Sequence, residues 1–405
     1  MTAHTRSGAI KVDKLHWARR KGGVCSLRRT LKTQDTERIE FMGKFKSRWA
    51  DFGPLPNAER CVRFEIGEIM GLVIIHNTTL GPGLGGLRVK RYESEAATLA
   101  DAARLSRGMA YKNSSAGLEL GGAKAVINAN PDELTLGHLR AYGEVVQELG
   151  GHYITAPDVG TEVSMMDVIK ETTEFVVCVS RENGGLDDPS PSTARGVFLA
   201  MQEALPFAGN LSHLTQLIVL IQGYGKVGRP LAHLLQANNF KVLVAEAATT
   251  QRDEASGDGC ELIDPSKVFE TRAHIFAPCA TGGILNQDSI LALKNEGVRL
   301  ICGGANNQLQ DEGPDSELLK EKKIWWAPDF VANSGGVALA CTEWELRTGK
   351  IRIDEVGDRT EMRLAGIGKR VRKIMAKAED RDCTSLFAAR KLAEDTVAKQ
   401  GGLLR

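Results

Sequence analysis

The stretch LIVLIQGYGKVG, residues 217–228, determines which fold this chain adopts. Its five leading apolar residues predict a strand buried on both faces, as in a parallel sheet. A helix is expected at about 226–238 and a second apolar run, KVLVA, follows at 241–245, so the segment predicts a βαβ unit. Between the first strand and the helix lies a G-x-G-x-x-G motif made of Gly223, Tyr224, Gly225, Lys226, Val227 and Gly228. In this context the motif is typical of a Rossmann dinucleotide-binding domain.

The glycines of this motif, and an acid after the second strand, have separate roles in such a domain. Gly223 permits the tight turn, Gly225 lets the backbone approach a pyrophosphate, and Gly228 lets the helix pack against the sheet. Glu246 ends the second strand and is expected to accept hydrogen bonds from the adenosine ribose and to repel the extra phosphate of NADP. Arg252 lies nearby in the sequence and could reach such a phosphate instead. The pattern predicts NAD as cofactor, with a purely structural βαβ unit as the alternative.

The composition narrows the classes of protein to consider. A chain of 405 residues suggests two domains or more. Lys and Arg number 52 and Asp and Glu 51, which argues against nucleic acid or an anionic membrane as the main partner. No apolar run is long enough to span a bilayer. The eight cysteines form no C-x-x-C pair and the eight histidines show no metal-binding spacing. We therefore expect reduced thiols in a cytoplasmic protein and no bound catalytic metal.

The region before the motif mixes strands, helices and glycine-rich turns, which predicts an α/β or α+β domain. In chain order we expect a strand from Cys61 to Ile66, its neighbour at 71–76, a glycine-rich loop at 81–86, a helix at about 94–111 capped by Ser94, and, after a break at Gly121 and Gly122, a short strand at 125–128.

The fold class expected for the whole chain is α/β with two domains. A linker-like stretch at 181–192 is the best candidate for the boundary and hinge. Near the C-terminus, apolar residues at helical spacing predict one buried stripe, formed by Leu364, Ile367, Val371 and Ile374. We therefore expect a substrate-binding and oligomerisation domain at 41–189, a Rossmann domain at 190–337, and C-terminal helices at 338–405 that pack back on the first domain.

The first forty residues are basic and poor in acids. They hold no apolar segment, so a secretory signal is excluded. A transit peptide is one interpretation. The interpretation we favour is a disordered extension at 1–40, with Met42 as an alternative start.

Two lysines, Lys112 and Lys124, lie in a segment rich in glycine and small apolar residues, 109–124. Lysines are usually solvated surface charges. Among small apolar groups, however, a lysine loses hydration and its pKa falls toward neutrality, and a second positive charge nearby lowers it further. Such a lysine can act as a general base near pH 7.

This segment resembles the signature of the glutamate/leucine/phenylalanine/valine dehydrogenase family, and of the leucine type in particular. The resemblance extends through further motifs in family order, at 80–86, 155–161, 189–194, 277–280, 305–309 and 327–336. It implies an NAD-dependent amino-acid dehydrogenase that acts on a CH–NH₂ group and assembles as a homo-oligomer through its first domain.

Carried over residue by residue, the resemblance implies a role for each matching position. Lys112 would bind the substrate carboxylate, Lys124 would be the base that activates water, and Asp158 would exchange a proton with the amino group or the carbinolamine. The backbone of Gly85 and Gly86 would line the substrate. The residues near the nicotinamide end of the cofactor would be Thr193, Ala280, Asn306 and Asn333.

Leu84 indicates which kind of substrate side chain the site accepts. Glutamate-specific relatives have a lysine at this position, directly before the two glycines. An apolar residue there would leave a second carboxylate buried and unpaired, which costs several kcal/mol. Leu84, Ala156 and Val337 would suit an aliphatic side chain such as that of leucine, valine or isoleucine, or an aromatic one if the pocket is wide.

Two other readings stay open. The chain could be an aromatic amino-acid dehydrogenase, for phenylalanine or tryptophan, or a specialised biosynthetic relative. It could also be a non-catalytic NAD-binding scaffold or sensor, against which the presence of Lys112, Lys124 and Asp158 argues.

Overall fold

The computed structural model describes residues 17–19, 25–27, 47–51, 53, 55, 57–209, 211 and 216–404. Most of the extension predicted at 1–40, and Met42, lie outside the described residues. Within that extension, β1 (Trp17–Arg19) and β2 (Cys25–Leu27) form an antiparallel pair.

The second half of the chain contains a six-stranded sheet in the order β11-β10-β9-β12-β13-β14, with all neighbours parallel. This is the strand order of a Rossmann fold. The predicted βαβ unit is present, because β9 and β10 flank α5 and pair in parallel with Ile218 opposite Lys241. The strands are β9 (Ile218–Gln222), β10 (Lys241–Ala245), β11 (Glu261–Ile263), β12 (Ile275–Pro278), β13 (Leu300–Ile301) and β14 (Trp325–Trp326).

Helices and short 3₁₀ turns connect these strands. The prediction that the linker extends through 192 is wrong, because a helix already begins at Ser190, where prolines at its start suit a first turn. The helix after the glycine motif begins at Gly228, two residues later than predicted. The elements are α4 (Ser190–Ala204), α5 (Gly228–Ala237), α6 (Thr249–Gly257), α7 (Gln287–Asn295) and α8 (Glu312–Glu321), with turns at Arg181–Asn183, Leu205–Phe207 and Pro265–Glu270.

The first half of the chain forms a second six-stranded sheet in the order β3-β4-β5-β7-β6-β8. Its first three pairings are antiparallel, whereas β6 lies parallel to both β7 and β8. The strands predicted near 61–66 and 71–76 are present. The bounds are β3 (Ser47–Asp51), β4 (Arg60–Ile66), β5 (Ile69–Asn77), β6 (Gly83–Val89), β7 (Gly121–Ile127) and β8 (Tyr153–Pro157).

Two glycine-rich segments were predicted to interrupt the chain, and both predictions are wrong. Gly83 to Gly86 belong to strand β6, and Gly121 and Gly122 begin strand β7. The glycines serve close packing: a Cβ at Gly85 would lie 1.7 Å from Ala123 O, and a Cβ at Gly122 would lie 2.1 Å from the backbone nitrogen of Ala110. Neighbouring backbone therefore requires glycine where local propensity predicts a turn.

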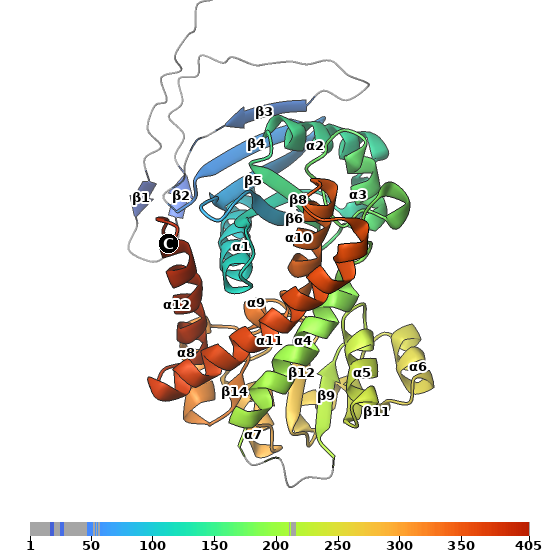
Figure 1. Ribbon diagram of the computed structural model, residues 1–405, viewed down its shortest axis with the longest axis vertical. Helices are drawn as coiled ribbons and strands as arrows, with labels where there is room; N and C mark the ends of the chain where they lie inside the picture. Colours follow the sequence, from blue (N-terminus) through green and yellow to red (C-terminus); the bar gives the residue numbers. More distant parts are fainter. Residues whose placement is uncertain are drawn as a thin grey trace, which may run out of the picture.

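Helices cover both faces of this sheet (Figure 1). α1 packs on one face, where Ala102 joins a cluster with Leu72 and Val126, and Ser94 caps it as predicted. On the other face, Tyr142 and Met166 from the next two helices pack on the sheet. The bounds are α1 (Glu95–Ser115), α2 (Leu136–Glu148) and α3 (Val163–Lys170), with a 3₁₀ turn at Pro131–Glu133.

The C-terminal helices contact both halves. The predicted stripe on α11 is buried in one cluster with α4 and the Rossmann sheet. α12 packs against α1, where Ser114 Oγ donates to Ala393 O at 2.7 Å. Figure 1 shows α11 running beside α4, with α10 above them near the first sheet. The bounds are α9 (Asp329–Ala332), α10 (Gly335–Arg347), α11 (Val356–Asp380) and α12 (Ser385–Ala398), with a turn at Ile353–Glu355.

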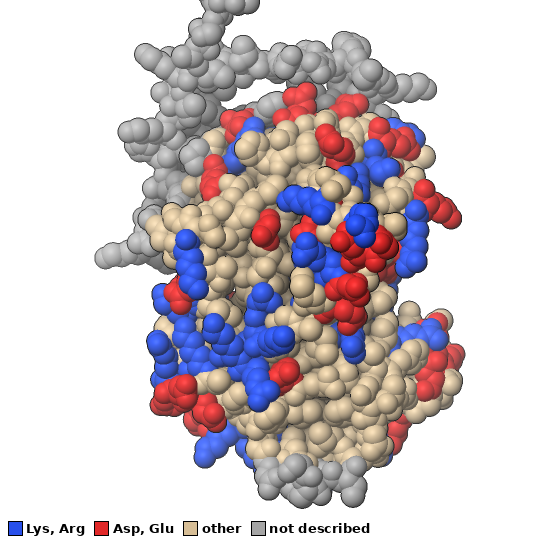
Figure 2. Space-filling model, viewed as in Figure 1, with Lys and Arg blue, Asp and Glu red and all other residues tan. Residues whose placement is uncertain are grey.

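The surface carries both signs of charge. Figure 2 shows acidic and basic side chains intermixed over much of the visible face, with a basic area over the lower ends of α11 and α12. There Lys373, Lys377 and Lys399 line a groove of about 420 Å³ together with Asp395. Among the described helices, none has the length and apolar character needed to cross a membrane. The seven cysteines whose side chains are described are free thiols.

Candidate active site

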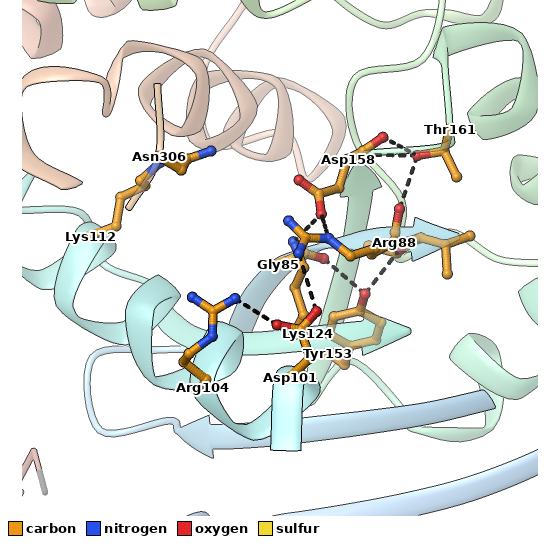
Figure 3. A network of polar contacts seen from close by, with 12 residues as sticks. Gly85, Arg88, Asp101, Arg104, Lys112, Lys124, Tyr153, Asp158, Thr161 and Asn306 are labelled. Atoms are coloured by element: carbon orange, nitrogen blue, oxygen red, sulfur yellow. Dashed lines mark hydrogen bonds and ion pairs between the residues drawn. The ribbon is translucent and has the colours of Figure 1, made fainter. Parts of the chain in front are cut away.

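Three neighbouring strands bring a lysine, a carboxylate and an arginine together. Lys124 lies in the middle of β7, Asp158 directly follows β8, and Arg88 lies near the end of β6 between them. Lys124 Nζ is 2.7 Å from Asp158 Oδ2, and Arg88 Nε donates to the same oxygen at 2.9 Å. Figure 3 shows both cations converging on this one carboxylate.

Burial and charge act in opposite directions on this pair. Lys124 is only 4% exposed, and burial lowers its pKa although the carboxylate of Asp158 opposes that effect. Burial alone would raise the pKa of Asp158, but Lys124 and Arg88 outweigh it and lower this pKa to about 2. At rest Asp158 is therefore a carboxylate.

A second lysine spans the two halves of the molecule. Lys112, in the last turn of α1, donates from Nζ to Asn306 Oδ1 at 3.0 Å, and Asn333 Nδ2 donates to the same oxygen at 2.8 Å. In Figure 3, Lys112 and Asn306 lie side by side, apart from the pair on the strands. Removal of water by the surrounding protein lowers the pKa of Lys112 to about 8, against the attraction of Asp329. This cation is suited to bind a carboxylate.

An apolar cluster adjoins these charges. Leu84 is 1% exposed, and the half-buried Ala156 and Val337 pack against the cluster it belongs to. Gly86 lies between this cluster and the ion pair, because a Cβ there would be 2.8 Å from Asp158 Cβ. The residues predicted to line the substrate side chain are thus together in space.

The glycine motif forms the turn that its sequence predicts. Gly223 has a φ of +96°, which favours glycine. A Cβ at Gly228 would lie 2.0 Å from Gly223 O, so the helix start packs closely on the turn. A Cβ at Gly225, in contrast, would meet nothing within 4 Å. The loop therefore presents open backbone at Gly225 to the start of α5, as a pyrophosphate requires.

Glu246 lies beside the glycine turn and is fixed by the backbone. Its Oε2 accepts from Tyr224 N at 2.7 Å and its Oε1 from Ala248 N at 2.9 Å. Burial would raise its pKa, but these hydrogen bonds lower it, so the group is a carboxylate. Arg252 donates from one nitrogen to Glu246 O at 2.9 Å and to Ile263 O at 3.4 Å. The arginine is therefore engaged with backbone carbonyls.

A buried acceptor without a partner lies on Asn333, next to Asn306. Asn333 Nδ2 donates to Asn306 Oδ1 and, at 3.2 Å, to Gly304 O. Asn333 Oδ1 is buried and accepts no hydrogen bond from any residue that the structure describes. Buried polar atoms normally have partners, so this oxygen suits a donor from a bound group, such as the amide of a nicotinamide. The residues fit a dinucleotide at both ends.

Two further predicted residues, Ala280 and Thr193, lie close to glycines of these segments. Ala280 faces the glycine turn, because a Cβ at Gly223 would be 2.7 Å from Ala280 Cβ. Thr193 lies in the first turn of α4, and its Oγ1 would be 2.7 Å from a Cβ at Gly336.

Comparison with known proteins decides the family. Residues 62–175 match the model of the Glu/Leu/Phe/Val dehydrogenase dimerisation domain, and residues 243–401 match that of the Glutamate/Leucine/Phenylalanine/Valine dehydrogenase domain. The chain belongs to this dehydrogenase family. It is 39% identical to leucine dehydrogenase of Thermoactinomyces intermedius over 81% of this chain and 87% of the relative. It is 37% identical to L-tryptophan dehydrogenase of Nostoc punctiforme, over 82% and 90%, and 37% identical to valine dehydrogenase of Streptomyces coelicolor, over 82% and 89%.

Solved structures agree with this assignment. The crystal structure of L-tryptophan dehydrogenase from Nostoc punctiforme matches with a TM-score of 0.69 at 34% identity, over 83% of this chain and 93% of that one. Glutamate dehydrogenase from Thermus thermophilus also reaches a TM-score of 0.69, at 22% identity and over 83% and 85%, and shows the shared fold. The predicted family, α/β fold and amino-acid dehydrogenase class are confirmed.

Within this dehydrogenase fold, three side chains of the glycine motif have partners in the protein itself. Tyr224 OH donates to Asp258 at 2.9 Å. Lys226 is exposed and 3.5 Å from Asp188, and Val227 packs against the core of the Rossmann half. These positions offer backbone to a dinucleotide, whereas their side chains stabilise the turn.

Sequence reasoning missed several polar residues of the site. Arg88 contacts Asp158 and Asp101, and Asp329 is buried close enough to Lys112 to affect its charge. Asn113 is buried next to Lys112 and donates to Leu84 O and Gly121 O. A signal for Arg88 existed, since it follows Gly86 by two residues and so points to the same face of the strand.

Proposed function

We propose that this amino-acid dehydrogenase catalyses the NAD-dependent, reversible oxidative deamination of an apolar L-amino acid to its 2-oxo acid and ammonia. The observation that carries the proposal is the buried pair of Lys124 and Asp158 beside a second lysine, Lys112. Deamination needs a base and a proton carrier in contact, and a cation for the substrate carboxylate.

Each residue then has one task. Lys112 binds the α-carboxylate and orients the α-carbon. A bound NAD would supply the hydride acceptor for that carbon, so that the substrate becomes an iminium ion. Lys124 takes a proton from the water that attacks the iminium carbon. Asp158 takes a proton from the substrate's ammonium group before hydride transfer. It returns this proton to the amino group as the carbinolamine collapses to the 2-oxo acid and ammonia, and the hydroxyl proton is released to water.

The low pKa of Asp158 fits this sequence of events. With its pKa at about 2, the carboxyl holds no proton at rest. Once Lys124 is neutral, one of the two charges that lower this pKa is gone. Asp158 is therefore able to accept a proton only at the stage at which Lys124 has given up its own.

The preference for NAD rests on Glu246 and Arg252. The carboxylate of Glu246 is held by two backbone amides, and the guanidinium of Arg252 is engaged with two backbone carbonyls. A 2′-phosphate would meet the negative charge of Glu246, while one nitrogen of Arg252 is already engaged with the backbone. This arrangement supports NAD over NADP.

The preference for an apolar side chain rests on the cluster around Leu84. Its neighbours Ala156 and Val337 carry no charge that could pair with a distal carboxylate. The names of the relatives at 37–39% identity include leucine, valine and tryptophan dehydrogenases. We propose a branched-chain amino acid as substrate, and the similar match to tryptophan dehydrogenases favours an aromatic amino acid as the second candidate.

We also propose a homo-oligomer formed through the first half of the chain. The match of residues 62–175 to a dimerisation domain supports this. The cytoplasmic location expected from the cysteine pattern stays a prediction.

A panel of amino acids tests the function directly. NADH or NADPH formation is followed by absorbance with leucine, valine, isoleucine, phenylalanine, tryptophan and glutamate, each with NAD and with NADP. We expect turnover with NAD and an apolar amino acid. Binding of NAD without turnover of any amino acid would instead identify a non-catalytic scaffold.

The variant Leu84→Lys tests the pocket. An unpaired ammonium buried beside an apolar substrate costs several kcal/mol, so kcat/KM for the best apolar substrate should fall by about 100-fold. Glutamate, which can pair with the new charge, should lose much less or gain. Leu84→Met, apolar and of similar size, is the matched comparison and should cost no more than about tenfold. Equal losses for all substrates would contradict the assignment of Leu84.

A further inference from the structure

Arg88 occupies the centre of a chain of charges in the site. Its Nε donates to Asp158 Oδ2 at 2.9 Å, and its Nη1 donates to Asp101 Oδ2 at 3.2 Å. The side chains of all three residues are between 14% and 17% exposed. One planar guanidinium thus joins the carboxylate next to Lys124 with a carboxylate on helix α1 (Figure 3).

Asp101 is itself held firmly. Tyr92 OH donates to its Oδ2 at 2.6 Å, and Arg104 donates to its Oδ1 at 2.6 Å. Asp101 therefore fixes the outer end of Arg88, and the guanidinium can move little without breaking two ion pairs.

The contacts of Asp158 are one-sided. Both cations bind Oδ2, and the backbone nitrogen of Asp158 donates to Thr161 Oγ1 at 2.8 Å. Within the described part of the chain, Oδ1 accepts no hydrogen bond, and it is not among the buried atoms without a partner. Oδ1 is thus the accessible oxygen that can meet a substrate.

We propose that Arg88 is a positioning residue of this site, which holds Asp158 so that Oδ1 is presented to the substrate and which keeps a positive partner on that carboxylate whenever Lys124 is neutral. The inference rests on the proposed deamination. If Arg88 were absent, Asp158 would face Lys124 alone and would hold the proton on the base. With Arg88 present, Lys124 can lose its proton without leaving a buried carboxylate unpaired.

The electrostatics of the site agree with this role. The charged or titratable groups that interact with the pair are Arg88 on β6, Asp101 and Lys112 on α1, and Tyr153 on β8. Tyr92 and Arg104 act on Asp101, and Asp329 acts on Lys112.

Arg88 acts on both members of the pair in one direction. It lowers the pKa of Asp158 and the pKa of Lys124, although burial and the attraction of Asp158 are the larger influences on the lysine. Its removal should raise both. Asp158 would still be ionised near neutral pH, because its pKa starts at about 2. The visible change is therefore in Lys124, which would stay protonated to a higher pH.

Three variants test the proposal. Arg88→Met removes the charge and both contacts. Arg88→Lys keeps a positive charge but cannot reach Asp158 and Asp101 in the same planar geometry. Arg104→Met is the matched control, because it removes a cation from Asp101 without touching Asp158.

The first readout is the pH profile of kcat/KM for the best amino acid. We expect Arg88→Met to lower kcat by about 100-fold and to shift the rising limb upward by about one pH unit. Arg88→Lys should restore the position of the limb but not kcat. Arg104→Met should keep the wild-type limb. An unshifted limb in Arg88→Met, with loss of thermal stability alone, would reduce Arg88 to a structural residue and overturn the proposal.

The second readout needs no turnover. Competitive acetylation, with the peptide that contains Lys124 measured by mass spectrometry, gives the pH at which this amine becomes neutral. The midpoint should be higher in Arg88→Met than in the wild type and unchanged in Arg104→Met. If the wild type deaminates no amino acid, the proposed function fails, yet this midpoint still decides the role of Arg88. If the midpoint is the same in Arg88→Met and in the wild type, Arg88 does not have the proposed role.

Discussion

Two buried carboxylates in this molecule differ in charge state because their partners differ. Asp158 is flanked by Lys124 and Arg88, which lower its pKa to about 2 against the effect of burial. Glu343, on α10, is fully buried and accepts from Val179 N at 3.2 Å and Leu186 N at 2.9 Å, and burial raises its pKa to about 7. The backbone amides and the charge of Arg347 do not offset the loss of water at Glu343, whereas two contacting cations do at Asp158.

The two carboxylates also serve different parts of the chain. Glu343 fastens the segment that leads from the first sheet to α4. That segment is closed by the bond from Asp187 N to Val179 O at 3.1 Å, and it is bracketed by positive φ angles at Cys178 (59°) and Asp187 (66°). Such angles cost free energy in residues other than glycine, so the clamp by Glu343 helps to hold the strained turn. Asp158 is placed for proton transfer, whereas Glu343 holds the segment that connects the first sheet to α4.

The largest effect is expected from breaking the ion pair between Lys124 and Asp158. Lys124→Ala removes the proposed base and leaves Asp158 with Arg88 alone. We expect kcat for the best amino acid to fall by about a thousandfold, which corresponds to about 4 kcal/mol, because a positioned general base contributes in that range. NADH formation measures the loss, and a thermal melt with and without NAD checks that fold and cofactor binding persist. A variant that folds, binds NAD and keeps a tenth of the activity would rule out Lys124 as the base.

The next largest effect is on how the free energy of unfolding depends on pH. The folded protein holds the proton of Glu343 more tightly than the unfolded chain, since its pKa rises from 4.5 to about 7. The free energy of unfolding should therefore decrease as pH rises from about 4.5 to about 7, by about 3 kcal/mol from this group. Asp158 acts in the opposite sense: its lowered pKa stabilises the protein above about 3.8, and this is lost as pH falls toward 2.

Denaturant unfolding between pH 5 and 8 measures the contribution of Glu343. Glu343→Gln cannot ionise, so its stability should lack the decrease that the wild type shows in this range. Its amide places a donor against one of the two backbone amides, which should cost about 1–3 kcal/mol at pH 5. Parallel curves for the two proteins would mean that Glu343 is charged throughout and is stabilised by Arg347 one turn away.

The local geometry of the nucleotide loop was predictable from sequence, because a single short segment contains all of its requirements. The strand, the turn at Gly223 and the close approach at Gly228 depend on neighbours within a few residues. The glycines of β6 were wrongly predicted to form a loop, because the contacts that require them come from distant parts of the chain. Gly85 is required by Ala123 on the adjacent strand, and no local pattern announces a backbone 38 positions further along the chain.

The partners of the charges in the site were not predictable, although the alternation along β6 indicates the face on which Arg88 lies. Arg88 meets Asp158 across 70 residues of sequence, and Glu343 meets Val179 across 164. The sequence also left open whether Arg252 reaches a phosphate of the cofactor. In the fold, its guanidinium donates to the carbonyls of Glu246 and Ile263. Resemblance to a family identified the lysines, but which charges balance them depends on how distant strands and helices pack.

The smallest expected effect concerns a carboxylate that lies between the two cases. Asp329 is buried and accepts from Gln308 N at 3.0 Å and Phe330 N at 2.7 Å, as Glu343 does from its amides, but it also attracts Lys112. Burial raises the pKa of Asp329, while its negative charge raises the pKa of Lys112, which stands at about 8. Asp329→Asn should therefore lower the pKa of Lys112, so that this lysine loses its charge, and its hold on the substrate carboxylate, at a lower pH. We expect KM for the amino acid to rise about threefold relative to wild type at pH 9, because lowering the pKa of Lys112 by half a unit reduces its charged fraction about threefold at that pH. At pH 7 KM should change little, and kcat should stay within about twofold.

Asp315→Asn is the matched control: Asp315 is also buried and accepts from a backbone amide, that of Asp311, but it is not among the groups that act on Lys112. If both variants raise KM equally at the two pH values, the effect is one of stability, and Asp329 belongs with Glu343 as a structural carboxylate. If only Asp329→Asn shows the dependence on pH, its charge reaches the substrate through Lys112, and what separates the two classes of buried carboxylate is contact with a cation rather than depth.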